Sequence, residues 1–480
     1  MQINKKAFSN FSWKFAEQIC TQIVQFIVSV VLARILLPED YSVVSIIAII
    51  TSFCNVFIEG GLSKALVQKK DSDILDYSTV LYTSYTVSFF FYICLFIAAP
   101  YIASIYKNQL LIRVIRIYAL SLFITPISTI QYSYISKKLQ FRKLFWASFI
   151  GTVLSGVIGI YLANSGFGAW ALVGQRMIDS FVDTLIIFFC IDLRPTISFS
   201  FDRLKRLWKY GSKVLGTSIV DMIYDNIRPL IVGLQFSTAD LAYYEKGRSY
   251  PNILNSAINS TLSAVLFPLI VSVQDDYDRV KSLMRRFIRV TSFVLFPTLL
   301  GLAAVANNLV ILLITDKWIG TVPYIRIFCV FYMFQLLQTG NLQALFAIGR
   351  SDIVFKLAVI KKSINFILLF ILILFSHSPY LLAALGILTS LIAYFINALA
   401  NKKLLNYGLF DQLIDIMPNL FLSLAMYFLV YYIGYLNVQL HFLLLIQVLL
   451  GCGFYILMSF MFKNSSLLYI LSMIKGKTHR

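Results

Sequence analysis

Residues 78–100 read STVLYTSYTVSFFFYICLFIAAP, and this stretch decides the fold class because it contains no Asp, Glu, Lys or Arg. A helix needs about 20 mainly apolar residues to cross the hydrocarbon core of a bilayer, and these residues supply them. The whole chain has the same character, since 59% of its 480 residues are hydrophobic, 13% are charged and the mean hydropathy is +0.80. We therefore expect a membrane protein. A soluble enzyme, a secreted disulfide scaffold and a disordered chain are excluded.

Hydropathy along the chain predicts fourteen membrane-spanning helices. Short polar or Pro-bearing turns separate several of them, for example Pro38-Glu39-Asp40 and His377-Ser378-Pro379, and such connections are typical of tight helical hairpins. The predicted spans are residues 13–36, 41–61, 78–100, 112–132, 144–164, 168–190, 210–235, 243–272, 287–314, 322–346, 357–376, 379–400, 416–436 and 440–462. The expected fold class is therefore an all-α polytopic membrane protein.

The distribution of positive charge predicts the orientation of these helices. The chain has 41 Lys and Arg against 22 Asp and Glu, a formal net charge of +19. With both termini in the cytoplasm, the inward segments hold 31 Lys and Arg and the outward segments hold 7, which is the bias of the positive-inside rule. Topology thus accounts for most of the excess charge, so nucleic acid is not an expected partner. Residues 464–480, with Lys475, Lys477 and Arg480, are expected to form a basic amphipathic tail on the inner leaflet.

Metal and catalytic chemistry have little support in the sequence. The six cysteines and three histidines are scattered, without a CxxC pair or metal-ligand spacing, so no metal or other cofactor is expected. Every predicted outward loop is short and leaves no room for a catalytic domain there. We expect that the protein is not an enzyme, and a membrane-embedded glycosyltransferase or polymerase is the weakest alternative.

The chain repeats a pattern in its two halves. Trp13-Lys14-Phe15 opens the first span, Trp208-Lys209-Tyr210 opens the seventh, and both spans run to a short acidic turn. Two six-helix lobes of the same orientation would enclose a central cavity, whereas convergence on aromatic and basic helix ends is the alternative. The expected domains are an N-terminal lobe at 1–200, a C-terminal lobe at 201–405, two additional helices at 406–463 and the tail at 464–480.

Four stretches carry a resemblance to a known family: residues 33–41 (ARILLPEDY), 59–68 (EGGLSKALVQ), 138–144 (KLQFRKL) and 349–352 (GRSD). With them the chain resembles, over nearly its whole length, the polysaccharide flippases of the multidrug/oligosaccharidyl-lipid/polysaccharide exporter superfamily, which includes O-antigen and capsule-unit flippases. Ser42 stands where that family usually has glycine, so the geometry of this turn is in question.

The resemblance implies a function. Fourteen helices in two lobes would export an undecaprenyl-pyrophosphate-linked oligosaccharide, a polysaccharide or lipopolysaccharide repeat unit, across the bacterial plasma membrane by alternating access. The implied partners are this lipid-linked substrate, membrane lipids and the polysaccharide assembly machinery.

Ionisable groups inside predicted spans are costly in lipid, so we expect them to face a cavity or one another. Positive groups could hold a lipid pyrophosphate, and carboxylates could bind H⁺ or Na⁺ and bias two conformations. Structural ion pairs are the alternative, and we favour it for Arg176 with Asp179 and Asp183. The candidates for substrate binding are Lys14, Arg176, Arg228 and Arg248, and those for ion coupling are Glu17, Asp179, Asp183, Asp221 and Asp225.

Glu59 and Arg350 lie in the family-like stretches near the cytoplasmic face and are candidates for an inner gate, although snorkelling at a helix end would also place them there. A multidrug or organic-cation exporter of the same superfamily is the alternative function. Cations require acidic cavity walls and a pyrophosphate requires basic ones, so the sign of charge in the cavity separates the two.

Overall fold

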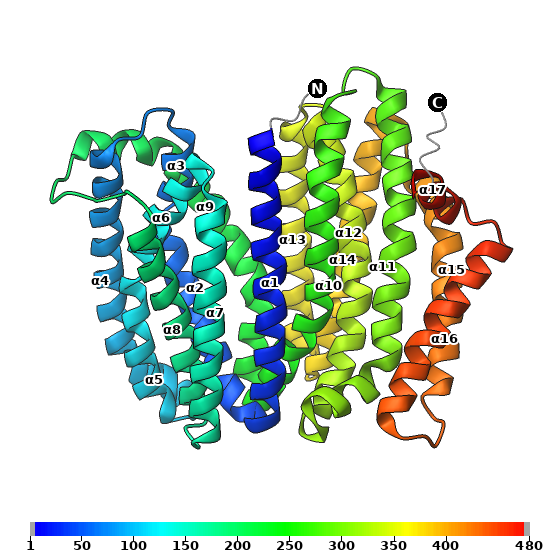
Figure 1. Ribbon diagram of the computed structural model, residues 1–480, viewed down its shortest axis with the longest axis horizontal. Helices are drawn as coiled ribbons and strands as arrows, with labels where there is room; N and C mark the ends of the chain where they lie inside the picture. The colour runs from blue at the N-terminus through cyan, green and yellow to red at the C-terminus, as the bar shows by residue number, and fades with distance from the viewer. Residues whose placement is uncertain (1–4, 475–480) are drawn as a thin grey trace. The chain divides into compact units, whose positions relative to one another are not determined.

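The computed structural model describes residues 5–474, with side chains described at 13–259, 266, 269–335, 337–469 and 471. Every regular element in this range is helical, which confirms the predicted all-α class (Figure 1). The first ten elements are α1 (Lys5–Ile35), α2 (Pro38–Glu59), α3 (Leu62–Gln68), α4 (Ile74–Ile105), α5 (Leu110–Tyr118), η1 (Ala119–Phe123), α6 (Thr125–Lys138), α7 (Phe141–Asn164), α8 (Ala169–Cys190) and α9 (Phe201–Gln235). The remaining nine are α10 (Thr238–Val271), α11 (Tyr277–Ile314), η2 (Asp316–Thr321), α12 (Val322–Ala347), α13 (Ser351–Phe375), α14 (Pro379–Leu405), α15 (Leu409–Ile433), α16 (Leu440–Met461) and α17 (Ser465–Ile474).

Eleven helical segments within the described residues are long and apolar enough to cross a membrane. Helices α8, α9 and α10 coincide with three further predicted spans but are not among the eleven. In α8 and α9 the reason is charge. The predicted span in α8 contains three charged residues, Arg176, Asp179 and Asp183, and the one in α9 contains four, Lys213, Asp221, Asp225 and Arg228. The number fourteen therefore stays a prediction.

The predicted turns lie where the helices end, with one exception. Pro38 occupies the first turn of α2 and Pro379 the first turn of α14, where the missing N–H of proline costs nothing. The span predicted at 112–132 is not one continuous helix, because the 3₁₀ segment η1 divides it into α5 and α6. Pro126 lies in the first turn of α6, and its ring favours such an interruption.

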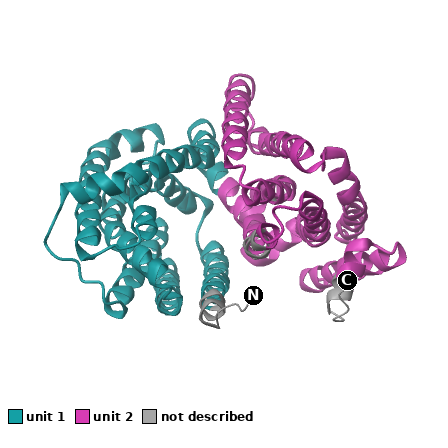
Figure 2. Ribbon diagram, turned by 90° about the horizontal axis from the view of Figure 1, so that it is seen from above, with its two compact units in different colours: residues 1–242 teal, residues 243–480 magenta. Residues whose placement is uncertain are grey.

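The chain divides into two compact units, residues 1–242 and 243–480 (Figure 2). The division differs from the lobe boundary predicted at residue 200, because α9 packs on α2 and α3 of the first unit. Gly61 makes this packing possible. A Cβ at Gly61 would lie 2.3 Å from the carbonyl oxygen of Gly211 in α9, and Gly61 also has a left-handed φ of +67°. Both features require glycine.

A similar hydrogen bond from a glutamine side chain to a backbone carbonyl occurs in each unit. In the first unit the Gln131 side chain donates to the carbonyl oxygen of Thr184 over 3.1 Å, and in the second unit Gln338 donates to that of Ser390 over 2.9 Å. Both bonds join corresponding helices, α6 to α8 and α12 to α14. Gln131 is buried and Gln338 is half-buried, and the two-lobe arrangement stays a prediction.

Helix α17 packs against other helices of the second unit. Leu467 is buried in an apolar cluster with Phe293 of α11 and Tyr455 of α16. Asn464 donates to the side-chain oxygen of Asn419 over 2.8 Å, and Ser466 donates to the carbonyl oxygen of Arg289 over 3.2 Å. The first part of the predicted tail is thus held by the protein itself. Lys475, Lys477 and Arg480, which motivated the lipid-surface prediction, lie outside the described residues.

Candidate functional site

A cavity of about 540 Å³ lies in the first unit near the start of α1. Two lysines contribute to its wall, Lys14 from α1 and Lys64 from α3, together with Tyr132 from α6 and Tyr210 from α9. Serine hydroxyls and Gln68 supply further polar atoms, and no carboxylate is among the described side chains that line it. The cavity therefore offers positive charge and hydrogen-bond donors, a combination that suits an anion.

Lys14 lies where the sequence analysis expects it, beside Glu17 on one face of α1. Its ammonium is 2.6 Å from the Glu17 carboxylate, and the Lys14 side chain is 49% exposed while that of Glu17 is 14% exposed. Residues three apart on a helix are neighbours, which is why the sequence alone finds this pair. An anion in the cavity would compete with Glu17 for Lys14.

Asp183 of α8 is bound by hydroxyl groups from two other helices. Tyr132 of α6 donates to one carboxylate oxygen, and Ser148 of α7 donates to the other over 3.1 Å. Asp183 is 9% exposed, so these bonds stabilise a charge that has little access to water. Because the Tyr132 side chain also lines the cavity, one residue contacts both the cavity and the buried carboxylate.

The ion-pair interpretation of the α8 trio is wrong. Asp179 accepts a hydrogen bond from Ser155 of α7 over 3.2 Å, and within residues 5–474 neither Asp179 nor Asp183 forms an ion pair with the exposed Arg176. Helices α7 and α8 pack closely here, since a Cβ at Gly151 would lie in van der Waals contact with α8, 3.4 Å from the Asp183 backbone nitrogen. The hydroxyls of α7 thus reach the carboxylates.

The charges of α9 lie in two different environments. Asp221 and Asp225 are exposed, whereas Arg228 is 8% exposed and its guanidinium carbon lies 5.9 Å from the centre of the Tyr224 ring. Arg228 does not line the 540 Å³ cavity. In the second unit, Arg248 is half-buried on α10. The structure therefore brings Lys14 to the cavity wall, with Glu17 beside it on α1 but outside the lining, and Arg228 and Arg248 are not among the lining residues.

The two gate candidates lie at helix ends. Glu59 is exposed at the end of α2, directly before the Gly60-Gly61 turn. Arg350 precedes α13 and binds Asp352 with two hydrogen bonds of 3.0 and 3.1 Å. The hydrogen bond to Asp352 raises the pKa of the Arg350 guanidinium. Arg350 thus has a local partner at its own helix start, and the gate stays a prediction.

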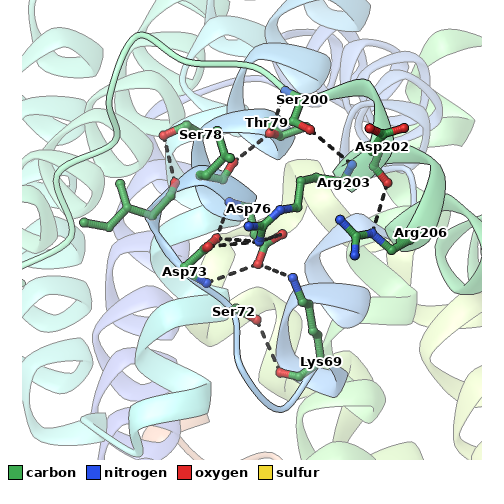
Figure 3. A network of polar contacts seen from close by, with 12 residues as sticks. Lys69, Ser72, Asp73, Asp76, Ser78, Thr79, Ser200, Asp202, Arg203 and Arg206 are labelled. Carbon is green, nitrogen blue, oxygen red and sulfur yellow. Dashed lines mark hydrogen bonds and ion pairs between the residues drawn. The ribbon is translucent and has the colours of Figure 1, made fainter.

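A second polar cluster joins the starts of α4 and α9 (Figure 3). The carboxylate of Asp76 is fully buried, and Lys69 and Arg203 both donate to it, the latter over 3.2 Å. Arg203 also reaches Asp73, which caps α4. Sequence analysis missed this cluster because Arg203 and Asp76 are 127 residues apart. The cluster fixes the helix that carries Tyr210.

The second unit has a comparable cluster at the start of α15. The buried Asp415 carboxylate accepts from Arg285 over 2.7 Å, from Arg289 over 2.9 Å and from Tyr407 over 2.9 Å. These bonds join α11 to α15, the first of the two helices predicted as an addition to the lobes. Neither arginine is close to Asp415 in sequence, so no local pattern could reveal the contact.

Comparison with known proteins identifies what this chain is similar to. The ExoT succinoglycan biosynthesis transport protein of Rhizobium meliloti (strain 1021) is 24% identical over 317 residues, which cover 66% of this chain and 64% of ExoT. An uncharacterized membrane protein in the cps region of Klebsiella pneumoniae is 26% identical and covers 99% of this chain and 98% of its own. The solved structure of the lipid II flippase MurJ, in an inward closed conformation, has a TM-score of 0.74 at 15% identity, covering 96% of this chain and 99% of MurJ, and shows a shared fold.

A family described as polysaccharide biosynthesis protein matches residues 31–323. This range includes Lys64, Tyr132 and Asp183, and the match confirms the resemblance that the sequence motifs indicate. Because the matched residues make up more than half of the chain, it belongs to the polysaccharide biosynthesis protein family.

Proposed function

We propose that this chain is a flippase that moves an undecaprenyl-pyrophosphate-linked oligosaccharide across the bacterial inner membrane by alternating access. It crosses the membrane fourteen times as two lobes and two additional helices, with both termini in the cytoplasm, and catalyses no covalent step. The similarity to ExoT, a transport protein of polysaccharide biosynthesis, and the fold shared with MurJ support the proposal. The eleven apolar spanning segments and the charge bias of the connecting segments agree with it.

The observation that carries the proposal is the pair of lysines in a cavity whose described lining side chains include no carboxylate. A pyrophosphate has several negative charges, and ammonium groups bind phosphate oxygens through short, charge-assisted hydrogen bonds. Lys14 and Lys64 come from different helices, so together they can contact one pyrophosphate from two sides. Tyr210 lies in the same wall and its hydroxyl can donate to the first sugar, whereas the Tyr132 hydroxyl donates to Asp183.

Transport in one direction requires coupling, and we place it at Glu17 and Asp183. A phosphate that takes over Lys14 leaves Glu17 without its cation, so uptake of H⁺ or Na⁺ compensates the carboxylate. A cation bound to Asp183 replaces the hydrogen bond from the Tyr132 hydroxyl, and this hydroxyl then turns to the cavity. In both steps the ion favours one substrate state over another, which is the thermodynamic requirement for coupling.

The other candidates take part at later stages of the cycle. Arg176 is exposed on α8, Arg228 lies on α9 and Arg248 lies on α10. We assign these guanidinium groups to contacts with the pyrophosphate after it leaves the lysine pair. Asp221 and Asp225 would exchange ions in the alternate state. Glu59 and Arg350 would close the cytoplasmic side. These roles extend the sequence-based assignments.

A complementation experiment tests the proposal. In a strain that lacks this gene, the wild-type gene should restore the surface polysaccharide, and the Lys14→Ala/Lys64→Ala double variant should not, although it reaches the membrane in normal amounts. Lys138→Ala is the matched control, because this lysine is exposed at the same end of the unit but does not line the cavity. Normal surface polysaccharide in the double variant would overturn the assignment of the lysines.

The same strain separates the alternative of a multidrug exporter. Lysines without carboxylates in the wall disfavour an organic cation, so we expect unchanged drug susceptibility in the deletion strain. Increased susceptibility together with normal surface polysaccharide would replace the flippase proposal.

A further inference from the structure

The connector between α8 and α9 exposes its apolar side chains. Residues 196–201 read TISFSF, an alternation of polar and apolar side chains with a period of two. The connector bends at Ile197, where the Ser198 N–H donates to the Thr196 carbonyl oxygen over 2.8 Å, so the side chains are assigned to a side by their exposure. The apolar residues Ile197, Phe199 and Phe201 are 97%, 43% and 79% exposed. A connector surrounded by water would turn these three side chains to the protein, so the pattern requires another explanation.

The polar side of this connector is fixed to the protein. The backbone N–H of Thr196 donates to the hydroxyl of Ser78 over 2.9 Å, and the N–H of Ser200 donates to that of Thr79 over 3.3 Å. Both partners lie in the first turns of α4 (Figure 3). The Thr196 hydroxyl is also 2.7 Å from that of Ser198. The two backbone bonds hold the connector against α4, and Ile197, Phe199 and Phe201 stay exposed in this position.

Both ends of the connector are anchored as well. Before it, the Arg194 guanidinium donates to the carbonyl oxygens of Phe188 and Ile191 over 3.0 and 2.8 Å, closing the end of α8. After it, Arg203 binds the buried Asp76. Phe199 and Phe201 contact each other edge to face, with ring centres 5.1 Å apart. The exposed apolar side is therefore a built surface of three large side chains.

Charge indicates what covers this surface. Lys205 and Arg206 are exposed in the first turns of α9, shortly after the three apolar residues, and together with Arg203 they outnumber the exposed Asp202 that precedes them. Apolar side chains next to exposed cations are typical of segments that lie in a membrane interface, with the apolar side about 5–10 Å below the headgroups and the cations at headgroup level. Helix α8 ends where the predicted span 168–190 ends, and α9 begins before the predicted span 210–235, so the connector lies beside the membrane-embedded part.

From these observations we infer that residues 196–201 are an interfacial anchor, which inserts Ile197, Phe199 and Phe201 into the acyl region of the leaflet that the basic residues face. The occupant of the surface is lipid. The anchor holds the start of α9 at a constant depth, and the Arg203–Asp76 ion pair transmits that position to α4. The inference concerns the membrane and does not depend on which substrate is transported.

Site-directed spin labelling of the full chain in lipid nanodiscs tests the anchor. Cysteine is introduced at one position at a time in a background in which the exposed Cys94, Cys190 and Cys452 are replaced by Ser, and a nitroxide is attached. Accessibility to oxygen, which concentrates in lipid, and to a water-soluble nickel complex is then measured. Positions 197, 199 and 201 should be accessible to oxygen and protected from nickel, whereas the matched neighbours 196 and 198 should lack the lipid signature.

Three outcomes would overturn the inference. Nickel accessibility without alternation would mean that the connector lies in water. Protection at all five positions would mean that the protein covers it. Exposure to nickel in nanodiscs but protection in native membranes would assign the surface to a protein partner. Loss of fold through labelling is recognised by gel filtration, and the substitution pair Ile197→Ser and Thr196→Ser, read by the depth of the label at 199, gives a second measurement.

Discussion

Substitution of Gly61 by alanine should separate α9 from α3 and disturb the cavity. The left-handed backbone at this position costs a residue with a side chain about 1–2 kcal/mol. The added methyl would also lie 2.3 Å from the Gly211 carbonyl oxygen and 2.9 Å from the Val214 Cβ, both in α9. Backbone cannot move aside as a flexible side chain does, and overpacking of this kind costs about 1–3 kcal/mol. We expect a total loss of about 2–5 kcal/mol.

Thermal unfolding of the detergent-purified variant, compared with the wild type at one scan rate, measures this loss. Gly216→Ala is the matched control. Gly216 lies in α9, the helix against which Gly61 packs, and a Cβ at Gly216 meets no atom within 4 Å. It should leave stability unchanged or raise it by up to about 1 kcal/mol, because alanine is the better helix former. Because Gly61→Ala displaces the helix that carries Tyr210, it should also reduce transport. A Gly61→Ala protein as stable as the wild type would refute the close packing of α3 on α9.

Three further substitutions test the polar clusters. Tyr132→Phe removes a hydrogen bond to a buried carboxylate, worth about 1.5–3 kcal/mol. It should slow ion-driven transport in proteoliposomes by about tenfold or more while the protein stays folded. Unchanged ion dependence of transport would mean that Tyr132 has no part in the coupling step. Asp76→Asn should lower the thermal stability, since it leaves Lys69 and Arg203 facing a neutral group, and equal stability would mean that the ion pairs contribute nothing. Asp415→Asn should lower the free energy of unfolding by about 1.5–3 kcal/mol in the same assay, because hydrogen bonds to a charged group are lost while Arg285 and Arg289 stay partly exposed. The exposed Asp411→Asn should cost much less, and similar losses in both would contradict the buried position of Asp415.

Local patterns predicted most of the helices. Apolar runs of the right length, ended by turns such as Pro38-Glu39-Asp40, are sufficient because a backbone in lipid must satisfy its own hydrogen bonds within a helix. The failure at residues 119–123 has a physical reason. Hydropathy reports only that the segment is apolar, and it cannot distinguish an α-helix from a 3₁₀ turn of the same composition.

The candidate site was predicted only where its contacts are local. Lys14 and Glu17 are three residues apart on one helix, so their pairing follows from helical geometry. The same reasoning predicts the wrong partner for Asp183, because it considers Arg176 on its own helix and not the hydroxyls of Ser148 and Tyr132 on neighbouring helices. Which hydroxyl reaches a carboxylate depends on how closely two helices approach, and that distance is a property of packing.

Lipid flipping by the purified protein is the measurement that tests the central claim most directly. Proteoliposomes contain an undecaprenyl-pyrophosphate-linked sugar with a fluorescent group, and a reductant that cannot cross the bilayer destroys the fluorescence of molecules that reach the outer leaflet. The wild type and Lys138→Ala should expose the inner pool rapidly, and Lys14→Ala/Lys64→Ala should leave it protected. Equal rates for the double variant and the wild type, or no flipping by the wild type, would contradict a pyrophosphate held by two lysines in the cavity of the first unit.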